Sequence, residues 1–194
     1  MAFERDPHKL FPHDHLLKHT VLHLIPNSVT PNAVTALRFI LTPLVFWFLS
    51  IGDYAVGFPL FLFTAFTDAL DGTIARVRNK ITPWGTFYDP VADKILIGGV
   101  VLLIVATHIN WTFALVILGI ELLIVIGGYW RRSKGTVMSA NIFGKMKMLF
   151  QVVGVTLLLL AVWTGHTAFF LPASIAVLLL AIGLAIVSLF TYGL

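Results

Sequence analysis

The 194-residue sequence contains no cysteine and few charged residues. Without cysteine, the chain can form neither a disulfide framework nor a thiolate nucleophile. Charged residues make up only 11% of the sequence and hydrophobic residues 58%, which is too little charge to cover the surface of a soluble domain. The composition therefore excludes an ordinary soluble enzyme and indicates a membrane protein.

Six apolar segments are long enough to cross a bilayer, which takes about 20 residues of helix. They cover residues 33–51, 54–75, 90–109, 112–130, 143–163 and 168–190. The segments share no repeated pattern, which weakens an inverted-repeat transporter interpretation. We therefore predict an all-α membrane protein with six transmembrane helices.

The 13 lysine and arginine residues lie on one side of these segments. All of them are in or beside the N-terminal segment, the loop between spans two and three, or the loop between spans four and five. Because positive loops stay in the cytoplasm, both termini and the active site are predicted to be cytoplasmic, in a multi-pass protein of the cell (inner) membrane. Basic residues at this position contact anionic lipid, so no nucleic-acid partner is expected.

Residues 8–25 precede the first span and are predicted to form an amphipathic helix at the membrane interface. The chain would then consist of a cytoplasmic N-terminal segment, residues 1–31, and a six-helix transmembrane catalytic domain, residues 32–194. His15, His19 and His23 recur along this helix. Since they lack a carboxylate or cysteine at suitable spacing, a polar stripe facing the headgroups is favoured over a metal site.

Four of the nine acidic residues, Asp68, Asp71, Asp89 and Asp93, surround the loop between spans two and three. Each pair is spaced to share one helix face, three residues apart in span two and four apart in span three. The turn at 83–85 makes these spans antiparallel neighbours, so the two pairs should meet at the cytoplasmic end.

Four carboxylates near a bilayer repel one another and are costly without positive charge. Divalent ions supply that charge, and all-oxygen ligands favour Mg²⁺, Mn²⁺ or Ca²⁺ over zinc. Two such ions about 4 Å apart suit phosphoryl transfer. The alternative is that these aspartates cap helices and pair with Arg76, Arg78 and Lys94.

Small residues follow the first acidic pair. Gly72 and Ala75 lie beside the acidic face and leave room for a nucleotide or phosphate, whose charge Arg76 can neutralise. The alternative is a pair of helix-packing residues with an arginine that reaches to the headgroups.

The segment from Asp68 to Asp93 resembles the signature of the CDP-alcohol phosphotransferase family, D-x-x-D-G-x-x-A-R, eight residues, G-x-x-x-D-x-x-x-D. The resemblance implies a homologous six-helix fold with an interfacial N-terminal helix and a cytoplasmic-side polar cavity. It also implies that Asp68, Asp71 and Asp89 bind two divalent ions, Mg²⁺ or Mn²⁺, with Asp93 as a further ligand and the general base. Asp71, Gly72, Ala75, Arg76 and Gly85 would bind the CDP group of CDP-diacylglycerol, and CMP would leave.

Other stretches resemble phosphatidylglycerophosphate synthases, which implies glycerol 3-phosphate as the small alcohol phosphate that accepts the phosphatidyl group. They are residues 25–27, residues 35–39 with Pro43, residues 89–94, and the G-K-x-K-x-x-x-Q stretch from Gly144 to Gln151. Basic residues on the cytoplasmic side would bind its phosphate, namely Arg38, Arg131, Arg132, Lys134, Lys145 and Lys147.

The fourth span departs from those synthases. Glu121 matches, but Ile120 precedes it where they carry an arginine, and a further arginine is missing. Inositol phosphate or another lipid phosphate acceptor therefore remains open, and Glu121 is expected either to pair with an arginine or to be protonated.

Two other functions compete with transfer. A divalent-cation transporter would also use intramembrane acids, although it would not need the small residues and arginine at fixed spacing. A lipid-binding protein without activity is a further alternative, which the intact motif disfavours. Family members are often homodimers, and the apolar helix faces allow one here.

Overall fold

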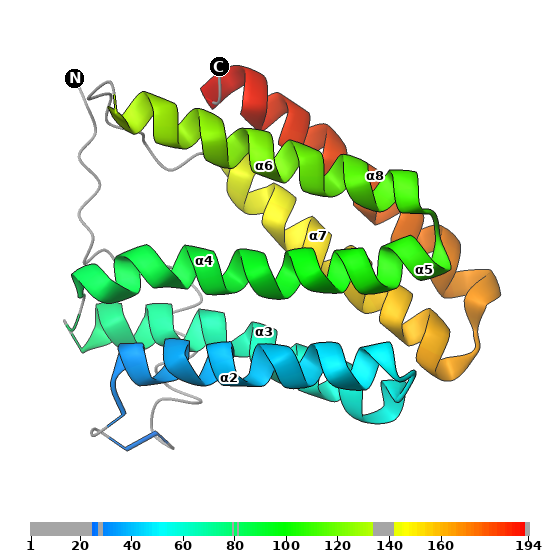
Figure 1. Ribbon diagram of the computed structural model, residues 1–194, viewed down its shortest axis with the longest axis horizontal. Coiled ribbons are helices and arrows are strands. Elements are labelled where there is room, and N and C mark those ends of the chain that lie inside the picture. Colours follow the sequence, from blue (N-terminus) through cyan, green and yellow to red (C-terminus); the bar gives the residue numbers. More distant parts are fainter. Residues whose placement is uncertain (1–24, 27–28, 79, 81, 134–141, 193–194) are drawn as a thin grey trace.

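The computed structural model describes residues 25–26, 29–78, 80, 82–133 and 142–192. Every regular element in these residues is helical, which confirms the predicted all-α fold (Figure 1). The helices are α2 (Pro31–Ser50), α3 (Tyr54–Val77), α4 (Pro83–Val100), η2 (Val101–Val105), α5 (Ala106–His108), α6 (Trp111–Ser133), α7 (Ile142–Thr164) and α8 (Thr167–Tyr192). The predicted interfacial helix lies outside the described residues except for Ile25, as do its three histidines and Lys134.

Side-chain caps set where the first helices begin. Thr30 Oγ1 accepts a hydrogen bond from the Ala33 amide at 3.2 Å, and Thr82 Oγ1 accepts one from the Gly85 amide at 3.0 Å. A proline follows each threonine at the first helical position, where its missing N–H costs nothing. Asp53 caps α3 in the same way.

Two tight turns form helical hairpins. Gly52 joins α2 to α3 with φ of +79°, and Gly165 joins α7 to α8 with φ of +74°. Residues with a side chain rarely adopt this left-handed backbone conformation, so both turns need glycine.

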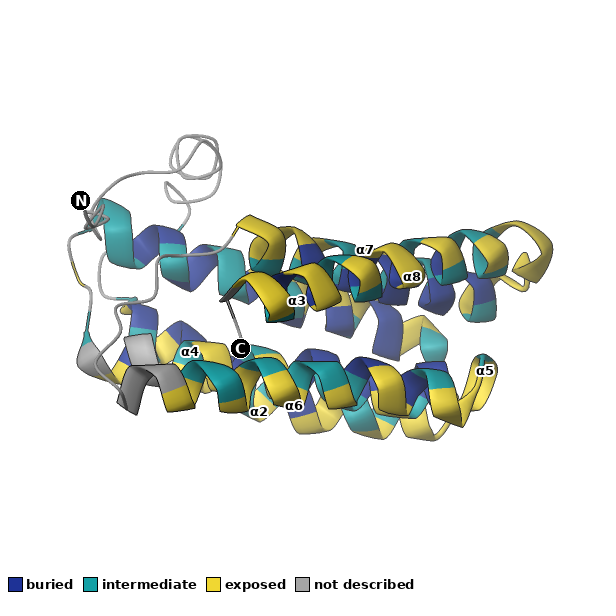
Figure 2. Cartoon of the chain, turned by 90° about the horizontal axis from the view of Figure 1, so that it is seen from above, coloured by how far each residue is buried: buried dark blue, intermediate teal, exposed yellow. Residues whose placement is uncertain are grey.

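The helices pack in two layers, with α2, α4 and α6 in one and α3, α7 and α8 in the other (Figure 2). The core between them is apolar and includes Val45, Phe61, Leu96, Val100 and Leu158, none of which is exposed. Helices α4, η2 and α5 run end to end as one rod. Because successive helices alternate in direction, the starts of α2, α4 and α7 and the ends of α3 and α6 share one end of the bundle (Figure 1).

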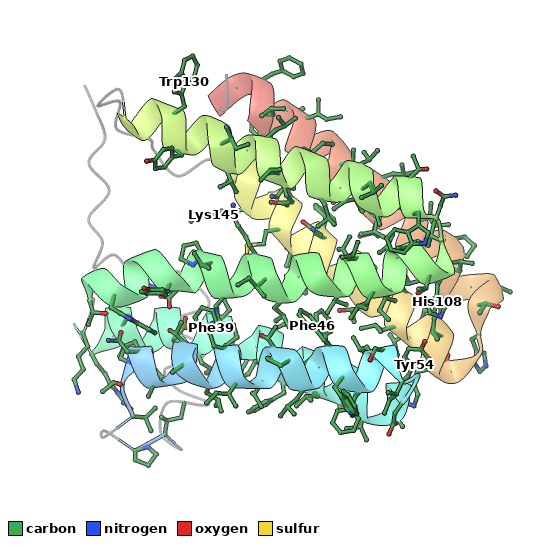
Figure 3. All side chains as sticks on the ribbon, in the orientation of Figure 1. Phe39, Phe46, Tyr54, His108, Trp130 and Lys145 are labelled. Carbon is green, nitrogen blue, oxygen red and sulfur yellow. The ribbon has the colours of Figure 1, made fainter. Side chains whose placement is uncertain are left out.

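The opposite end carries a different polar cluster. The Tyr54 hydroxyl lies 3.3 Å from His108 Nε2, and the two rings meet edge to face with their centroids 5.9 Å apart (Figure 3). This pair contains no carboxylate, whereas Asp68 and Asp71 lie near the other end of α3.

Five helical stretches in the described residues are long and apolar enough to cross a membrane, which makes the chain a multi-pass membrane protein. They are Pro31–Ser50, Tyr88–His108, Trp111–Trp130, Ile142–Thr164 and Thr167–Thr191. The predicted second span is helical, as α3, but is not among the five. Its second half carries Asp68, Asp71 and Arg76, which lower its hydropathy.

Candidate active site

Arg38 joins the two aspartates of α3. Its side chain reaches from α2 and donates hydrogen bonds to Asp68 Oδ1 at 2.8 Å and Asp71 Oδ2 at 2.5 Å, while Nε donates to Thr67 Oγ1 at 3.3 Å. Arg38 is 0% exposed and Asp71 is 2% exposed. A guanidinium presents donors in a planar fork, which suits it to hold two carboxylates at once.

Thr35 extends this network to α4. It lies one turn before Arg38 on the same face of α2, and its hydroxyl contacts Asp89 Oδ1 at 2.6 Å and Asp71 Oδ2 at 3.3 Å. One hydroxyl therefore lies between carboxylates of two helices. Asp68, Asp71 and Asp89, which we call the acidic cluster, meet at the shared end of α2, α3 and α4.

The donor chemistry of the acidic cluster fits hard divalent cations such as Mg²⁺ or Mn²⁺, which prefer carboxylate oxygens. In the structure, these carboxylates accept hydrogen bonds from Arg38 and Thr35. Across the described ranges, no three histidine, aspartate or glutamate side chains are grouped closely enough to hold an ion. The residue types of the acidic cluster fit a metal site. In the structure, the guanidinium of Arg38 compensates the charge of Asp68 and Asp71.

Asp93 lies one turn beyond Asp89 on α4 and faces a cavity of about 420 Å³ between α4, α6 and α7. The cavity also contains Lys94, Glu121, Lys147 and Gln151, and its remaining wall is apolar or glycine. Asp93 is within electrostatic reach of Asp68 and Arg38 as well as Glu121 and Lys147. It therefore stands between the acidic cluster and the cavity.

Two glycines of the motif lie against polar side chains. A Cβ on Gly85 would come within 3.2 Å of Thr82 Oγ1, 3.3 Å of Asn32 Oδ1 and 3.4 Å of Asp89 Oδ2. A Cβ on Gly72 would lie 3.2 Å from both terminal nitrogens of Arg76, so this guanidinium folds back over the glycine. Gly85 thus gives room to the polar residues around Asp89, and Gly72 gives room to Arg76.

The basic residues expected at an acceptor phosphate do not form one group. Arg38 is buried in the acidic cluster, and Lys147 is 8% exposed and forms an ion pair with Glu121. Lys145 is exposed on α7, and the backbone of Arg131 and Arg132 lies in the last turn of α6. Among the basic residues whose side chains the structure describes, Arg38, Lys145 and Lys147, only Lys147 lines the cavity. The expected arginine partner of Glu121 is replaced by Lys147.

Sequence reasoning named Arg78 only as a possible partner of the aspartates and did not single out Asn32. Arg78 donates hydrogen bonds to the carbonyls of Ile25, Pro26 and Val29 at 2.9–3.1 Å, so it ties the end of α3 to the segment before α2. Asn32 Oδ1 accepts a hydrogen bond of 2.7 Å from Thr82. The Pro31-Asn32 dipeptide repeats Pro26-Asn27 five residues later, and this repetition was the available signal.

Comparison with known proteins identifies relatives for most of the chain. A family model described as CDP-alcohol phosphatidyltransferase matches residues 28–189. A CDP-diacylglycerol–glycerol-3-phosphate 3-phosphatidyltransferase of Pseudomonas fluorescens is 37% identical over 54% of this chain and 57% of its own length. The Bacillus subtilis protein of the same name is 31% identical over 67% of this chain and 76% of its own length.

A cardiolipin synthase (CMP-forming) of Oryza sativa is also similar, with 33% identity over 69% of this chain and 46% of its own length. The match therefore spans about half of the Pseudomonas and rice proteins. These relatives have different names, so similarity alone does not select an acceptor.

Proposed function

The chain belongs to the CDP-alcohol phosphatidyltransferase family, and we propose that it transfers the phosphatidyl group of CDP-diacylglycerol to an alcohol and releases CMP. The observation that carries this proposal is the position of Asp93, between an acidic cluster built from α3 and α4 and a cavity of about 420 Å³. A donor bound at the cluster and an acceptor in the cavity would then meet at one carboxylate.

Divalent metal ions are used generally in this family. Asp68, Asp71 and Asp89, with Asp93, would hold two such ions, Mg²⁺ or Mn²⁺. When bound, the ions supply positive charge that stabilises the charge developing on the transferred phosphate. Arg38 and Thr35 engage one oxygen of each carboxylate in the acidic cluster, and this positions the aspartates before any ligand arrives.

Gly72, Ala75, Arg76 and Gly85, together with Asp71, would bind the CDP group. The guanidinium of Arg76 lies over Gly72, close to the acidic face of α3, and a phosphate bound beside α3 would meet its charge there. Gly85 lets Asn32 and Thr82 approach α4 closely.

Asp93 would act as the general base. It removes the proton from the acceptor hydroxyl, whose oxygen forms a bond to the phosphorus of the lipid phosphate. The bond from that phosphorus to the oxygen of CMP breaks, and CMP leaves with the electron pair. A base must lie within hydrogen-bond reach of its proton, and a carboxylate on the cavity wall meets that condition for an alcohol in the cavity.

Glycerol 3-phosphate is the acceptor we propose first, in keeping with the names of the Pseudomonas and Bacillus relatives. Lys147 supports this choice because it places an ammonium group at the cavity that Asp93 faces. A lipid alcohol is the second candidate, favoured by the mainly apolar cavity wall and by the rice cardiolipin synthase.

We also propose that α3 crosses the membrane as a sixth span, with the acidic cluster on the cytoplasmic side. Helix α3 packs along α2, which is apolar enough to span, so both lie in the same slab. The charged residues of α3 lie in its last three turns, where Arg38 compensates two of them. The basic loops at this end of the bundle support a cytoplasmic position of the acidic cluster. Exposed apolar helix faces would allow a homodimer in this orientation.

The test is a lipid product analysis. Purified protein in detergent with CDP-diacylglycerol and Mg²⁺ is supplied in turn with glycerol 3-phosphate, inositol phosphate and phosphatidylglycerol, and new lipids are identified by mass spectrometry. We expect one phosphatidylated product and equimolar CMP. Failure to form any product, together with Mn²⁺ uptake into liposomes, would instead support a cation transporter.

A further inference from the structure

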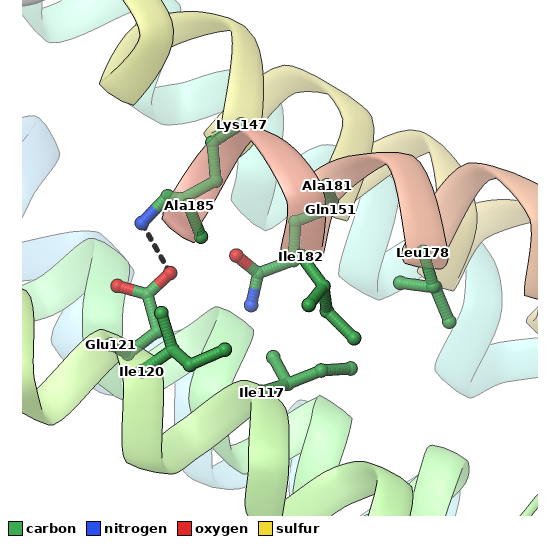
Figure 4. A pocket seen from close by; sticks show the side chains of 9 residues that line it. All are labelled: Ile117, Ile120, Glu121, Lys147, Gln151, Leu178, Ala181, Ile182 and Ala185. Carbon is green, nitrogen blue, oxygen red and sulfur yellow. Dashed lines mark hydrogen bonds and ion pairs between the residues drawn. The ribbon is translucent and has the colours of Figure 1, made fainter. Parts of the chain in front are cut away.

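Gln151 of α7 is a buried amide beside the ion pair of Glu121 and Lys147 (Figure 4). It is 4% exposed and lines the cavity of about 420 Å³ that Asp93 also lines. Within the part of the chain that the structure describes, its side chain forms no hydrogen bond. Every side-chain polar atom sealed inside these residues does have a partner, so the amide of Gln151 opens onto a cavity. Buried amides are nearly always hydrogen bonded, and the cavity is where this one can find a partner.

Two cavities meet at Gln151. The smaller one, of about 10 Å³ between α6, α7 and α8, is lined by Gln151, the ion pair and apolar side chains. That volume holds about one water molecule at most, whereas a side-chain amide offers two donors and an oxygen that can accept twice. The larger cavity is therefore where the remaining hydrogen-bonding capacity of this amide can be used.

We propose that Gln151 binds the secondary hydroxyl of a glycerol unit in the acceptor, and so makes the protein selective for a vicinal diol. The inference rests on the proposed transfer reaction and names the part of the acceptor that this residue recognises. A hydroxyl both donates and accepts, so it matches an amide without adding charge beside the ion pair. Glycerol 3-phosphate and the headgroup of phosphatidylglycerol both carry this hydroxyl, and the proposal applies to either acceptor.

The polar groups of such an acceptor match three side chains of the cavity. Asp93 of α4 would face the reacting primary hydroxyl, and Lys147 of α7 places an ammonium group where a phosphate can bind. Gln151 lies four residues after Lys147 on the same face of α7, which sets their Cβ atoms about 5–6 Å apart. In a glycerol phosphate, the secondary hydroxyl is on the carbon between those that carry the primary hydroxyl and the phosphate. The amide is therefore placed for the middle of the acceptor.

The experiment compares kcat/KM for each acceptor with kcat/KM for an analogue that lacks the secondary hydroxyl. The two pairs are glycerol 3-phosphate with 1,3-propanediol phosphate, and phosphatidylglycerol with phosphatidyl-1,3-propanediol. We expect the wild-type protein to prefer the acceptor that it uses over the analogue by about tenfold or more, because the analogue leaves a buried amide without its partner. In Gln151→Met, which keeps an unbranched side chain but removes the amide, this preference should disappear.

Thr156→Val is the matched control. It removes a hydroxyl from the same helix, one that donates to the Val152 carbonyl at 2.8 Å, and Thr156 lines neither cavity. The preference for the diol should therefore equal that of wild type. The KM for CDP-diacylglycerol should stay unchanged in both variants, because the amide is assigned to the acceptor.

Three results would overturn the proposal. The wild-type protein could use an acceptor and its analogue equally well, which needs no variant to establish. Gln151→Met could lower kcat/KM for both by the same factor, as expected if the residue only fills space between the helices. It could also raise the KM for CDP-diacylglycerol with the preference unchanged, which would place the donor at the amide. Absence of CMP release from the wild-type protein with any acceptor would instead refute the transfer reaction.

Discussion

Replacing Arg38 with glutamine would remove the cation that joins α2 to both aspartates of α3. Arg38 is 0% exposed and its donors lie 2.8 Å from Asp68 and 2.5 Å from Asp71, which is itself 2% exposed. Breaking a buried ion pair from one side costs about 3–5 kcal/mol, because the remaining charge is uncompensated. For a chain of this size, that loss corresponds to a Tm lower by roughly 6–20 °C.

The assay is thermal unfolding in detergent, in EDTA and again in millimolar Mg²⁺ or Mn²⁺. Divalent ions should raise the Tm of Arg38→Gln more than that of wild type, because ions bind carboxylates that have lost their arginine. Adding Asp71→Asn should recover much of the stability in EDTA by removing the uncompensated charge.

Lys80→Gln is the matched control, since it removes an exposed cation at the same end of the bundle and should change stability by less than about 0.5 kcal/mol. Unfolding of Arg38→Gln within about 2 °C of the wild type in EDTA would show that the arginine does not compensate these aspartates. Equal stabilisation of the variant and the wild type by metal would contradict binding of ions at the freed carboxylates.

Three further substitutions test other parts of the site. Asp93→Asn should abolish turnover while CDP-diacylglycerol binding remains measurable by ligand-induced thermal shift; turnover like wild type would contradict its role as base. Gly85→Ala should weaken Mn²⁺ binding severalfold, measured by electron paramagnetic resonance, because the new methyl group crowds Asp89. In the control Gly119→Ala, the new methyl group meets no atom within 4 Å, so Mn²⁺ should bind as in wild type. Arg78→Met should lose three hydrogen bonds to backbone carbonyls and expose the segment before α2 to protease, and unchanged cleavage there would count against this contact.

The helices and the acidic motif followed from the sequence because both depend on local spacing. Apolar runs of about 20 residues predict spans, and the helices from α2 to α8 lie close to those ranges. Asp68 and Asp71 are one turn apart, and the turn before α4 brings Asp89 beside them. Helical periodicity and an antiparallel hairpin sufficed for this part of the site.

The partners of the acids were harder to predict because they come from other helices. The alternative of pairing with Arg76, Arg78 and Lys94 used residues near the aspartates in sequence. The hydrogen bonds that the structure shows to these acids come from Thr35 and Arg38, whose direction depends on how α2 packs against α3.

Glu121 shows the same limit. Its partner is Lys147, which is 26 residues away on α7, rather than an arginine. Spacing along one helix carries no information about that contact, and the cavity between α4, α6 and α7 becomes visible only in three dimensions.

In the proposed phosphatidyl transferase, Asp93 joins a metal-binding acidic cluster to an acceptor cavity. The most direct measurement is CMP release from CDP-diacylglycerol by wild type and Asp93→Asn in the same liposomes, with and without acceptor alcohol, in Mg²⁺ and in EDTA. We expect release only from wild type, and only when both acceptor and Mg²⁺ are present. Release that continues in Asp93→Asn or in EDTA, or no release with any acceptor, would contradict it.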